Sequence, residues 1–128
     1  MDLQEAIINE FQRISEIKNK VFSVVAPPGT KTPYMVYSIS RTERETLLCG
    51  CNGLTETEIQ IDVYHIEYSK LIALKKLITK KIDSFNLRII GLDGPYIQQI
   101  EIINDFETYE NSLQIFKGIV ETKIYYRE

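Results

Sequence analysis

The hydrophobic and polar residues between positions 58 and 85 follow two periods, one after the other. Residues 58–64 alternate, and Ile59, Ile61 and Val63 fall on one side, which is typical of a strand with one buried face. From position 69 onward, the apolar residues recur at the spacing of one helix face: Leu71, Leu74, Ile78, Ile82 and Phe85. The pattern therefore predicts a strand that leads directly into an amphipathic helix, with a common core between them.

The rest of the chain extends this pattern in both directions. Residues 2–18 carry an apolar stripe at helical spacing and predict a first helix. The short apolar run 21–25 ends at two prolines and predicts a strand end or an edge segment followed by a turn. Alternation predicts strands at three further places: 33–41, 96–106 and 113–126. Residues 42–55 are rich in charged and turn-forming residues and predict a long hairpin loop.

Together these elements predict an α+β fold in a single domain that spans residues 1–128. Their order is helix, strand, strand, helix, strand, strand (α-β-β-α-β-β). Two hairpins separated by a helix favour a mainly antiparallel sheet of about four strands, with both helices packed on one face. A chain of 128 residues is long enough to bury a core without metal ions or disulfides.

The composition limits the classes of partner. A net charge of −3 gives the whole chain no positive footprint for nucleic acid. No apolar run approaches the roughly 20 residues that span a bilayer. The N-terminal residues are acidic and helical in pattern, which differs from a secretory signal. We therefore expect no membrane contact and a protein that is cytosolic or assembled in the cytosol.

Candidate catalytic and metal-binding residues are few. Cys49 and Cys51 could form a strained disulfide or half of a thiolate metal site, but His65 is the only histidine available as a further ligand. Two reduced loop thiols are the simpler interpretation. His65 alternates onto the apolar side of its strand, where a position at the rim of the core is commoner than a catalytic role. The six glycines are isolated, so no phosphate loop is present. We predict no catalytic residues, no metal site, no cofactor and no enzyme activity.

Two segments carry opposite charge. The lysines of the second predicted helix are spread around its flanks and back, which predicts a solvated surface: Lys70, Lys75, Lys76, Lys80 and Lys81. A later segment is acidic: Glu101, Asp105, Glu107 and Glu110. Opposite charges on two surfaces of one small protein would permit head-to-tail contact between copies, the kind of contact that closes rings.

The polar side of the central strand is the candidate interaction surface, and it carries four residues: Glu58, Gln60, Asp62 and Tyr64. Most of the eight tyrosines lie in predicted strands. A sheet face that mixes tyrosine, isoleucine and charge resembles an interface. Strands favour tyrosine in any case, so a plain solvated face fits equally well. Leu47 and Leu48, in the predicted loop, either fold back onto the core or contact a partner.

Several short motifs follow one another along nearly the whole chain. Val21-Phe22, Ala26-Pro27, Gly29 and Pro33-Tyr34 fit the pattern V-[FY]-x-x-x-A-P-x-G-x-x-x-P-Y. Residues 60–64 read Gln-Ile-Asp-Val-Tyr and lead into a helix, and an aromatic pair follows at Tyr125-Tyr126. In this order the motifs resemble the small tail-completion proteins of long-tailed bacteriophages and prophages, which include tail terminators and head–tail joining proteins.

The resemblance implies a structural role in the virion. Such proteins form a ring, usually hexameric, at the head-proximal end of the tail tube, where it stops tube polymerisation and meets the head connector. The implied partners are copies of the same chain, the tail tube protein and the head connector, with DNA only as passing cargo. The virion would be assembled in the bacterial cytoplasm.

The virion role leads to one further hypothesis about the ring, and one alternative function remains open. If Glu58 and Asp62 line the channel of a ring, their charge would repel passing DNA phosphates. The alternative function, from a different class, is a small regulatory or ligand-binding α+β domain that acts as a monomer or dimer.

Overall fold

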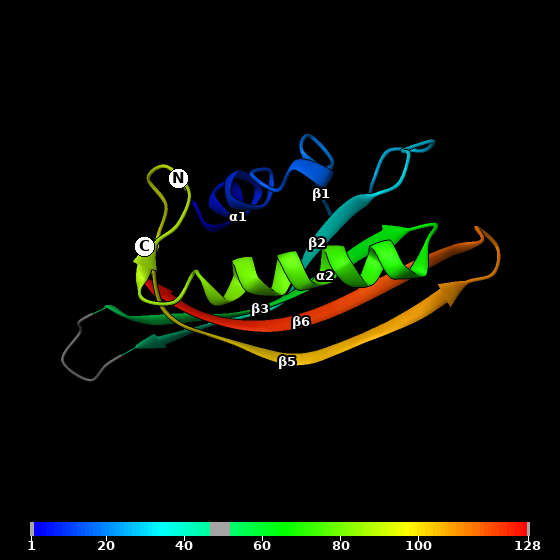
Figure 1. Ribbon diagram of the computed structural model, residues 1–128. Helices are drawn as coiled ribbons and strands as arrows, with labels where there is room; N and C mark the ends of the chain where they lie inside the picture. The colour runs from blue at the N-terminus through cyan, green and yellow to red at the C-terminus, as the bar shows by residue number, and fades with distance from the viewer. Residues whose placement is uncertain (1, 47–51, 128) are drawn as a thin grey trace.

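The computed structural model describes residues 2–46 and 52–127 (Figure 1). The chain begins with helix α1 (Leu3–Phe11) and a single 3-10 turn, η1 (Ser15–Ile17). Strands β1 (Val21–Ser23), β2 (Tyr34–Thr46) and β3 (Asn52–His65) follow, and β3 leads into helix α2 (Tyr68–Asp83). The last elements are strands β4 (Arg88–Ile89), β5 (Tyr96–Glu110) and β6 (Ile115–Arg127).

The strands form one six-stranded sheet in the order β1-β2-β3-β6-β5-β4. β1 runs parallel to β2, and every other neighbouring pair is antiparallel. The long strands β2, β3, β6 and β5 curl together beneath the helices (Figure 1). α1 and α2 lie on the same face of the sheet, and the opposite face has no described helix over it. This open face is therefore the larger surface that the strands present to their surroundings.

The predicted fold class was wrong. The sheet has six strands instead of about four, and it is mixed because β1 joins it parallel to β2. The predicted order α-β-β-α-β-β therefore omits β1 and β4. Residues 21–25 were predicted only as a strand end or an edge segment and were not counted as a strand, and β1 occupies the first three of them. β4 has two residues, too few for an alternating pattern to be recognised. The predicted hairpin loop at 42–55 was also too long, because β2 continues to Thr46 and β3 begins at Asn52.

The core lies between the helices and the sheet. Ile59, Ile61 and Val63 are at most 2% exposed, which confirms the buried side predicted for this strand. The apolar face of α2 packs on these residues, and the ring of Phe85 meets Phe11 of α1 edge-on at 5.6 Å. α1 begins at Asp2, whose Oδ1 accepts a hydrogen bond from the amide of Glu5 at 2.8 Å. This cap satisfies one of the free amide groups at the start of the helix.

A buried carboxylate connects α1 to the segment around β4. The Glu10 side chain is fully buried, and Arg88 binds it in a bidentate pair with both distances 3.0 Å. The amide of Gly91 donates to the same carboxylate at 2.7 Å, and Lys81 and Arg13 lie 3.6 Å away. Burial alone would raise the pKa of Glu10, but the hydrogen bonds from Arg88 and Gly91 outweigh it and lower the pKa below 4.5.

Truncation of a buried residue on α2 tests the packing of this helix. Ile78 is fully buried, whereas its neighbour Leu77 is 43% exposed. Ile78→Ala should lower the free energy of unfolding by about 2–5 kcal/mol, because it leaves a cavity in the core. The matched control Leu77→Ala should cost less than about 1 kcal/mol. Denaturant unfolding followed by circular dichroism measures both values, and equal losses would contradict the observed helix orientation.

Neutralisation of Glu10 tests the buried ion pair. Glu10→Gln should destabilise the fold by about 3 kcal/mol at pH 7, because it leaves the Arg88 charge without its partner. The control Glu5→Gln removes an exposed carboxylate from the same helix and should cost under about 1 kcal/mol.

The stability difference between the wild type and Glu10→Gln should depend on pH. The folded-state pKa of Glu10 is lowered, so its contribution is present above the unfolded-state value near 4.5. That contribution is lost as the pH falls through the lower folded-state value. The stability difference between the wild type and Glu10→Gln should therefore shrink below about pH 4.5. A difference that stays constant from pH 7 to pH 3 in denaturant titrations would rule out this account.

Candidate interaction surface

The open face of the sheet brings the predicted polar residues together. Glu58, Gln60, Asp62 and Tyr64 all lie on β3, opposite the buried residues Ile59, Ile61 and Val63. The pairing registers place Lys123, Glu121, Ile119 and Lys117 of β6 directly beside these four residues. Gln60 Nε2 donates to Asp62 Oδ1 at 2.9 Å. Leu47 and Leu48, the other two predicted contact residues, lie outside the described residues, as do Cys49 and Cys51.

A row of charges crosses the middle of the open face. Glu58 of β3 lies 3.9 Å from Arg41 of β2 on one side and 3.9 Å from Lys123 of β6 on the other. Lys123 also binds Glu56 at 3.1 Å. The hydrogen bond with Glu56 raises the pKa of Lys123, so the lysine is charged at any physiological pH. Cross-strand pairs of this kind stabilise a sheet by amounts below about 1 kcal/mol each.

An aromatic row lies near one end of the same face. Tyr34 of β2 stacks on Tyr64 of β3 with ring centroids 4.6 Å apart, and Phe22 of β1 meets Tyr34 edge-on at 6.4 Å. Lys117 Nζ lies 5.7 Å from the centre of the Tyr64 ring and 3.8 Å from Asp62. Burial raises the pKa of both tyrosines, so their hydroxyl groups stay protonated and can donate hydrogen bonds.

Three apolar residues of the open face are buried although no described helix lies over them. Val36, Ile115 and Ile119 are 6%, 6% and 8% exposed. Since none of the described helices covers them, we infer that the longer side chains of the neighbouring strands do so. The open face therefore combines ordered aromatic rings, paired charges and small apolar patches. That mixture suits contact with another protein surface.

The acidic residues of this face are balanced by cations. Glu56, Glu58 and Asp62 each lie within 4 Å of Arg41, Lys117 or Lys123. Sequence reasoning found the acidic residues because they share one strand, but it did not pair them with the cations, which come from other strands. Local neutralisation weakens the repulsion of DNA phosphates that Glu58 and Asp62 would exert alone.

The helix side of the sheet contains a second polar cluster that the sequence did not indicate. Lys75 was predicted to be solvated, and this was wrong, because it is only 5% exposed. Its ammonium group binds Asp105 and lies 3.0 Å from Glu107, both on β5. Burial would lower the pKa of Lys75, but the two carboxylates outweigh it and raise the pKa. Gly118 of β6 leaves room for this lysine, since a Cβ atom there would lie 2.5 Å from Lys75 Cδ.

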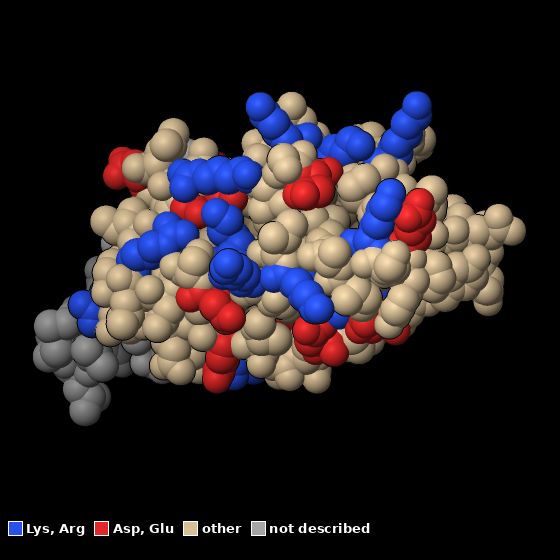
Figure 2. Space-filling view, viewed as in Figure 1, with Lys and Arg blue, Asp and Glu red and all other residues tan. Residues whose placement is uncertain are grey.

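The face of the molecule that carries the helices has charges of both signs. Lys and Arg side chains are spread over the helices, and Asp and Glu side chains line much of the lower rim, where β5 lies (Figure 2). The Lys75 cluster spans the boundary between them, so part of the predicted attraction between the basic helix and the acidic strand is satisfied within one chain.

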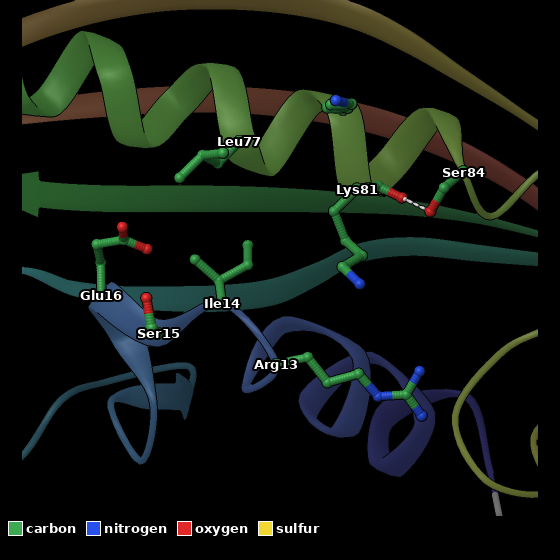
Figure 3. A pocket seen from close by; sticks show the side chains of 8 residues that line it. Arg13, Ile14, Ser15, Glu16, Leu77, Lys81 and Ser84 are labelled. Atoms are coloured by element: carbon green, nitrogen blue, oxygen red, sulfur yellow. Dashed lines mark hydrogen bonds between the residues drawn. The ribbon is translucent and has the colours of Figure 1, made fainter.

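A pocket of about 480 Å³ opens between the segment that follows α1 and the second half of α2 (Figure 3). Its lining includes Arg13, Ser15, Glu16, Lys81 and Ser84. The cations there could attract an anionic group, but Arg13 and Lys81 already lie 3.6 Å from the buried carboxylate of Glu10. Their arrangement is explained by the stability of the fold.

His65 lies in a smaller pocket of about 200 Å³ with Glu16, Lys70 and Leu74 among its neighbours. Its Nδ1 accepts a hydrogen bond from the amide of Glu67 at 3.0 Å, in the turn between β3 and α2. Burial lowers the pKa of His65, which favours the neutral form of the ring. Among the residues that the structure describes, no group of three or more His, Cys, Asp and Glu side chains could hold a metal ion. Within the same residues, no helix is long and apolar enough to cross a membrane.

Comparison with known proteins gives a fold and no family. The chain aligns with a solved chain of the "Virion of native gene transfer agent (GTA) particle" over 94% of its length and 92% of that chain, with a TM-score of 0.65 and 8% identity. A second solved structure, whose name describes no function, aligns over 98% of this chain and 96% of that one, with a TM-score of 0.54 and 11% identity. No protein-family profile matches the sequence, and no curated protein matches it. The likeness shows that this chain and a chain of a virion particle share a fold.

Proposed function

We propose that this protein is a structural component of a virion, in which it completes the tail. It would cap the tail tube and join it to the head connector as a ring of identical copies. The observation that carries the proposal is the fold, which is shared along nearly the whole chain with a chain from a virion particle. The motifs at 21–34 and 60–64, which resemble those of tail-completion proteins, support the same role.

The open face of the sheet supports a role in binding other proteins. It presents the Tyr34–Tyr64 stack and the charge row through Glu58, on strands that the core holds rigidly in place. Rigid, preformed surfaces bind partners at a lower entropic cost than flexible ones. The partners in this proposal are further copies of the chain, the tail tube protein and the head connector, at the head-proximal end of the tail. DNA would pass the ring without being bound, and the chain would catalyse no reaction.

Removal of the gene tests the proposed role. Particles assembled without this chain should show heads separated from tails and tail tubes of uncontrolled length in electron micrographs. Addition of purified protein to such a lysate should restore joined particles. Mass spectrometry of purified wild-type particles should find the chain in them. Joined particles of normal tail length in its absence would refute the proposal.

Substitutions on the open face test whether this surface contacts partners. The double variant Tyr34→Ala/Tyr64→Ala removes the aromatic stack while leaving the core residues unchanged. It should lower the yield of joined particles about tenfold or more, because a loss of about 1.4 kcal/mol at one contact weakens it tenfold. The matched control Tyr68→Ala removes an exposed tyrosine from the helix side and should complement fully. Full activity of a folded double variant would exclude the aromatic row as a contact.

A further inference from the structure

Two long edges of the sheet are open. β1 covers only Met35, Val36 and Tyr37 of the thirteen-residue strand β2. β4 covers only Tyr96 and Ile97 of the fifteen-residue strand β5. Beyond these short strands, β2 and β5 have no further strand beside them in the described part of the chain, and they lie on opposite sides of the sheet (Figure 1). Open edges carry unpaired backbone donors and acceptors, which another strand can satisfy.

The strand directions permit a continuous sheet between copies. β2 is antiparallel to β3, β3 to β6, and β6 to β5, so β5 runs antiparallel to β2. A second copy rotated about an axis along the strands keeps these directions. Its β2 then meets the β5 of the first copy as an antiparallel pair. The contact uses a different surface on each copy, and such heterologous contacts generate rings when the rotation closes.

The charges on the open face match across this junction. One register row runs through four residues in the order Arg41, Glu58, Lys123 and Glu101. The row alternates in sign and ends with a cation at the β2 edge and an anion at the β5 edge. Glu101 is exposed, and no salt bridge within the described residues engages it. The next copy's Arg41 would continue the alternation beside Glu101, while Arg41 keeps its contact with Glu58.

Each edge also carries a feature that limits unspecific pairing. The register shifts between Ile39 and Arg41 in β2 and between Ile102 and Asn104 in β5, which marks a β-bulge in each strand. Bulges and charges on edge strands hinder association with arbitrary strands. The two bulges lie next to the same register row, since Ile39 connects through Ile59 and Thr122 to Ile102.

We propose that copies of this chain associate edge to edge, with β5 of one copy antiparallel to β2 of the next and Glu101 beside Arg41. The inference rests on the proposed ring in the virion and identifies the surfaces that form it. The paired segments are residues 98–104 of β5 and 38–44 of β2, where both edges are open at the same level of the sheet.

Intermolecular disulfide formation tests the junction. Ser38 and Asn104 lie in one register row with Gln60 and Glu121 between them, so roughly 14 Å separates them within one chain. A disulfide needs Cα atoms within about 7 Å and could form only between copies. Ser38→Cys/Asn104→Cys, combined with Cys49→Ser and Cys51→Ser, should give dimers, trimers and larger species on a non-reducing gel after mild oxidation of assembled particles. Each single-cysteine variant should stay monomeric.

A charge reversal then tests the predicted pair. Glu101→Arg in the double-cysteine protein should reduce the cross-linked species about tenfold, because it places two cations at the junction. The control Glu16→Arg makes the same charge change at an exposed position on the helix side. It should leave the ladder of cross-linked dimers, trimers and larger species unchanged. Undiminished cross-linking with Glu101→Arg would exclude the Glu101–Arg41 contact. Circular dichroism confirms that each variant is folded.

The outcomes separate this inference from the proposed function. Particles that contain the chain but give no ladder overturn the edge contact and leave the virion role standing. A ladder in solution from a chain that is absent from particles supports the contact and overturns the virion role. Dimers from Asn104→Cys alone would indicate two β5 edges in a two-fold contact, which also overturns the proposal.

Discussion

The alternation along β3 is the constraint on which the rest of the structure depends. This strand lies in the interior of the sheet, paired with β2 and β6. Its odd-numbered residues Ile59, Ile61 and Val63 are buried in the core, where α2 packs against them. A slip of one residue in register would move these apolar side chains to the open face and bury Glu58 and Asp62 without partners. The cost of that exchange fixes the register of β3 and, through it, the positions of the neighbouring strands.

Sequence reasoning predicted the elements whose pattern repeats several times. The alternation at 58–64 and the apolar face of α2 each contain enough residues for the period to identify the buried side, and both are confirmed by burial. The strands β1 and β4 have three and two residues and owe their place to the strands beside them. No local pattern could have shown β1 joining the sheet in parallel, because that depends on the path of the chain between residues 24 and 33.

The polar residues of the site were predictable only in part, because their roles depend on residues far away in the sequence. Lys75 belongs to a helix with four other lysines, and only the position of β5 distinguishes it by bringing Asp105 and Glu107 to its ammonium group. Glu10 looks like an ordinary acid on the first helix, yet Arg88, 78 residues later, binds it in the core. On the open face, the pattern showed which residues share one side of β3, but not that β2 and β6 would supply the neutralising cations.

Two chains can share this fold at 8% identity because the core restricts the kind of side chain at each position more than its identity. The core requires apolar side chains at alternate positions and on one helix face, and many sequences meet that requirement. The open face is limited in another way, since a cross-strand pair such as Glu56 and Lys123 can be replaced or inverted without moving the backbone. Under the proposed function, in which the sheet face and its edges contact partners, nearly every residue could therefore change, provided that the contacts change in pairs with those of the partners. An active site permits no such freedom, because its chemistry requires particular side chains in a fixed geometry.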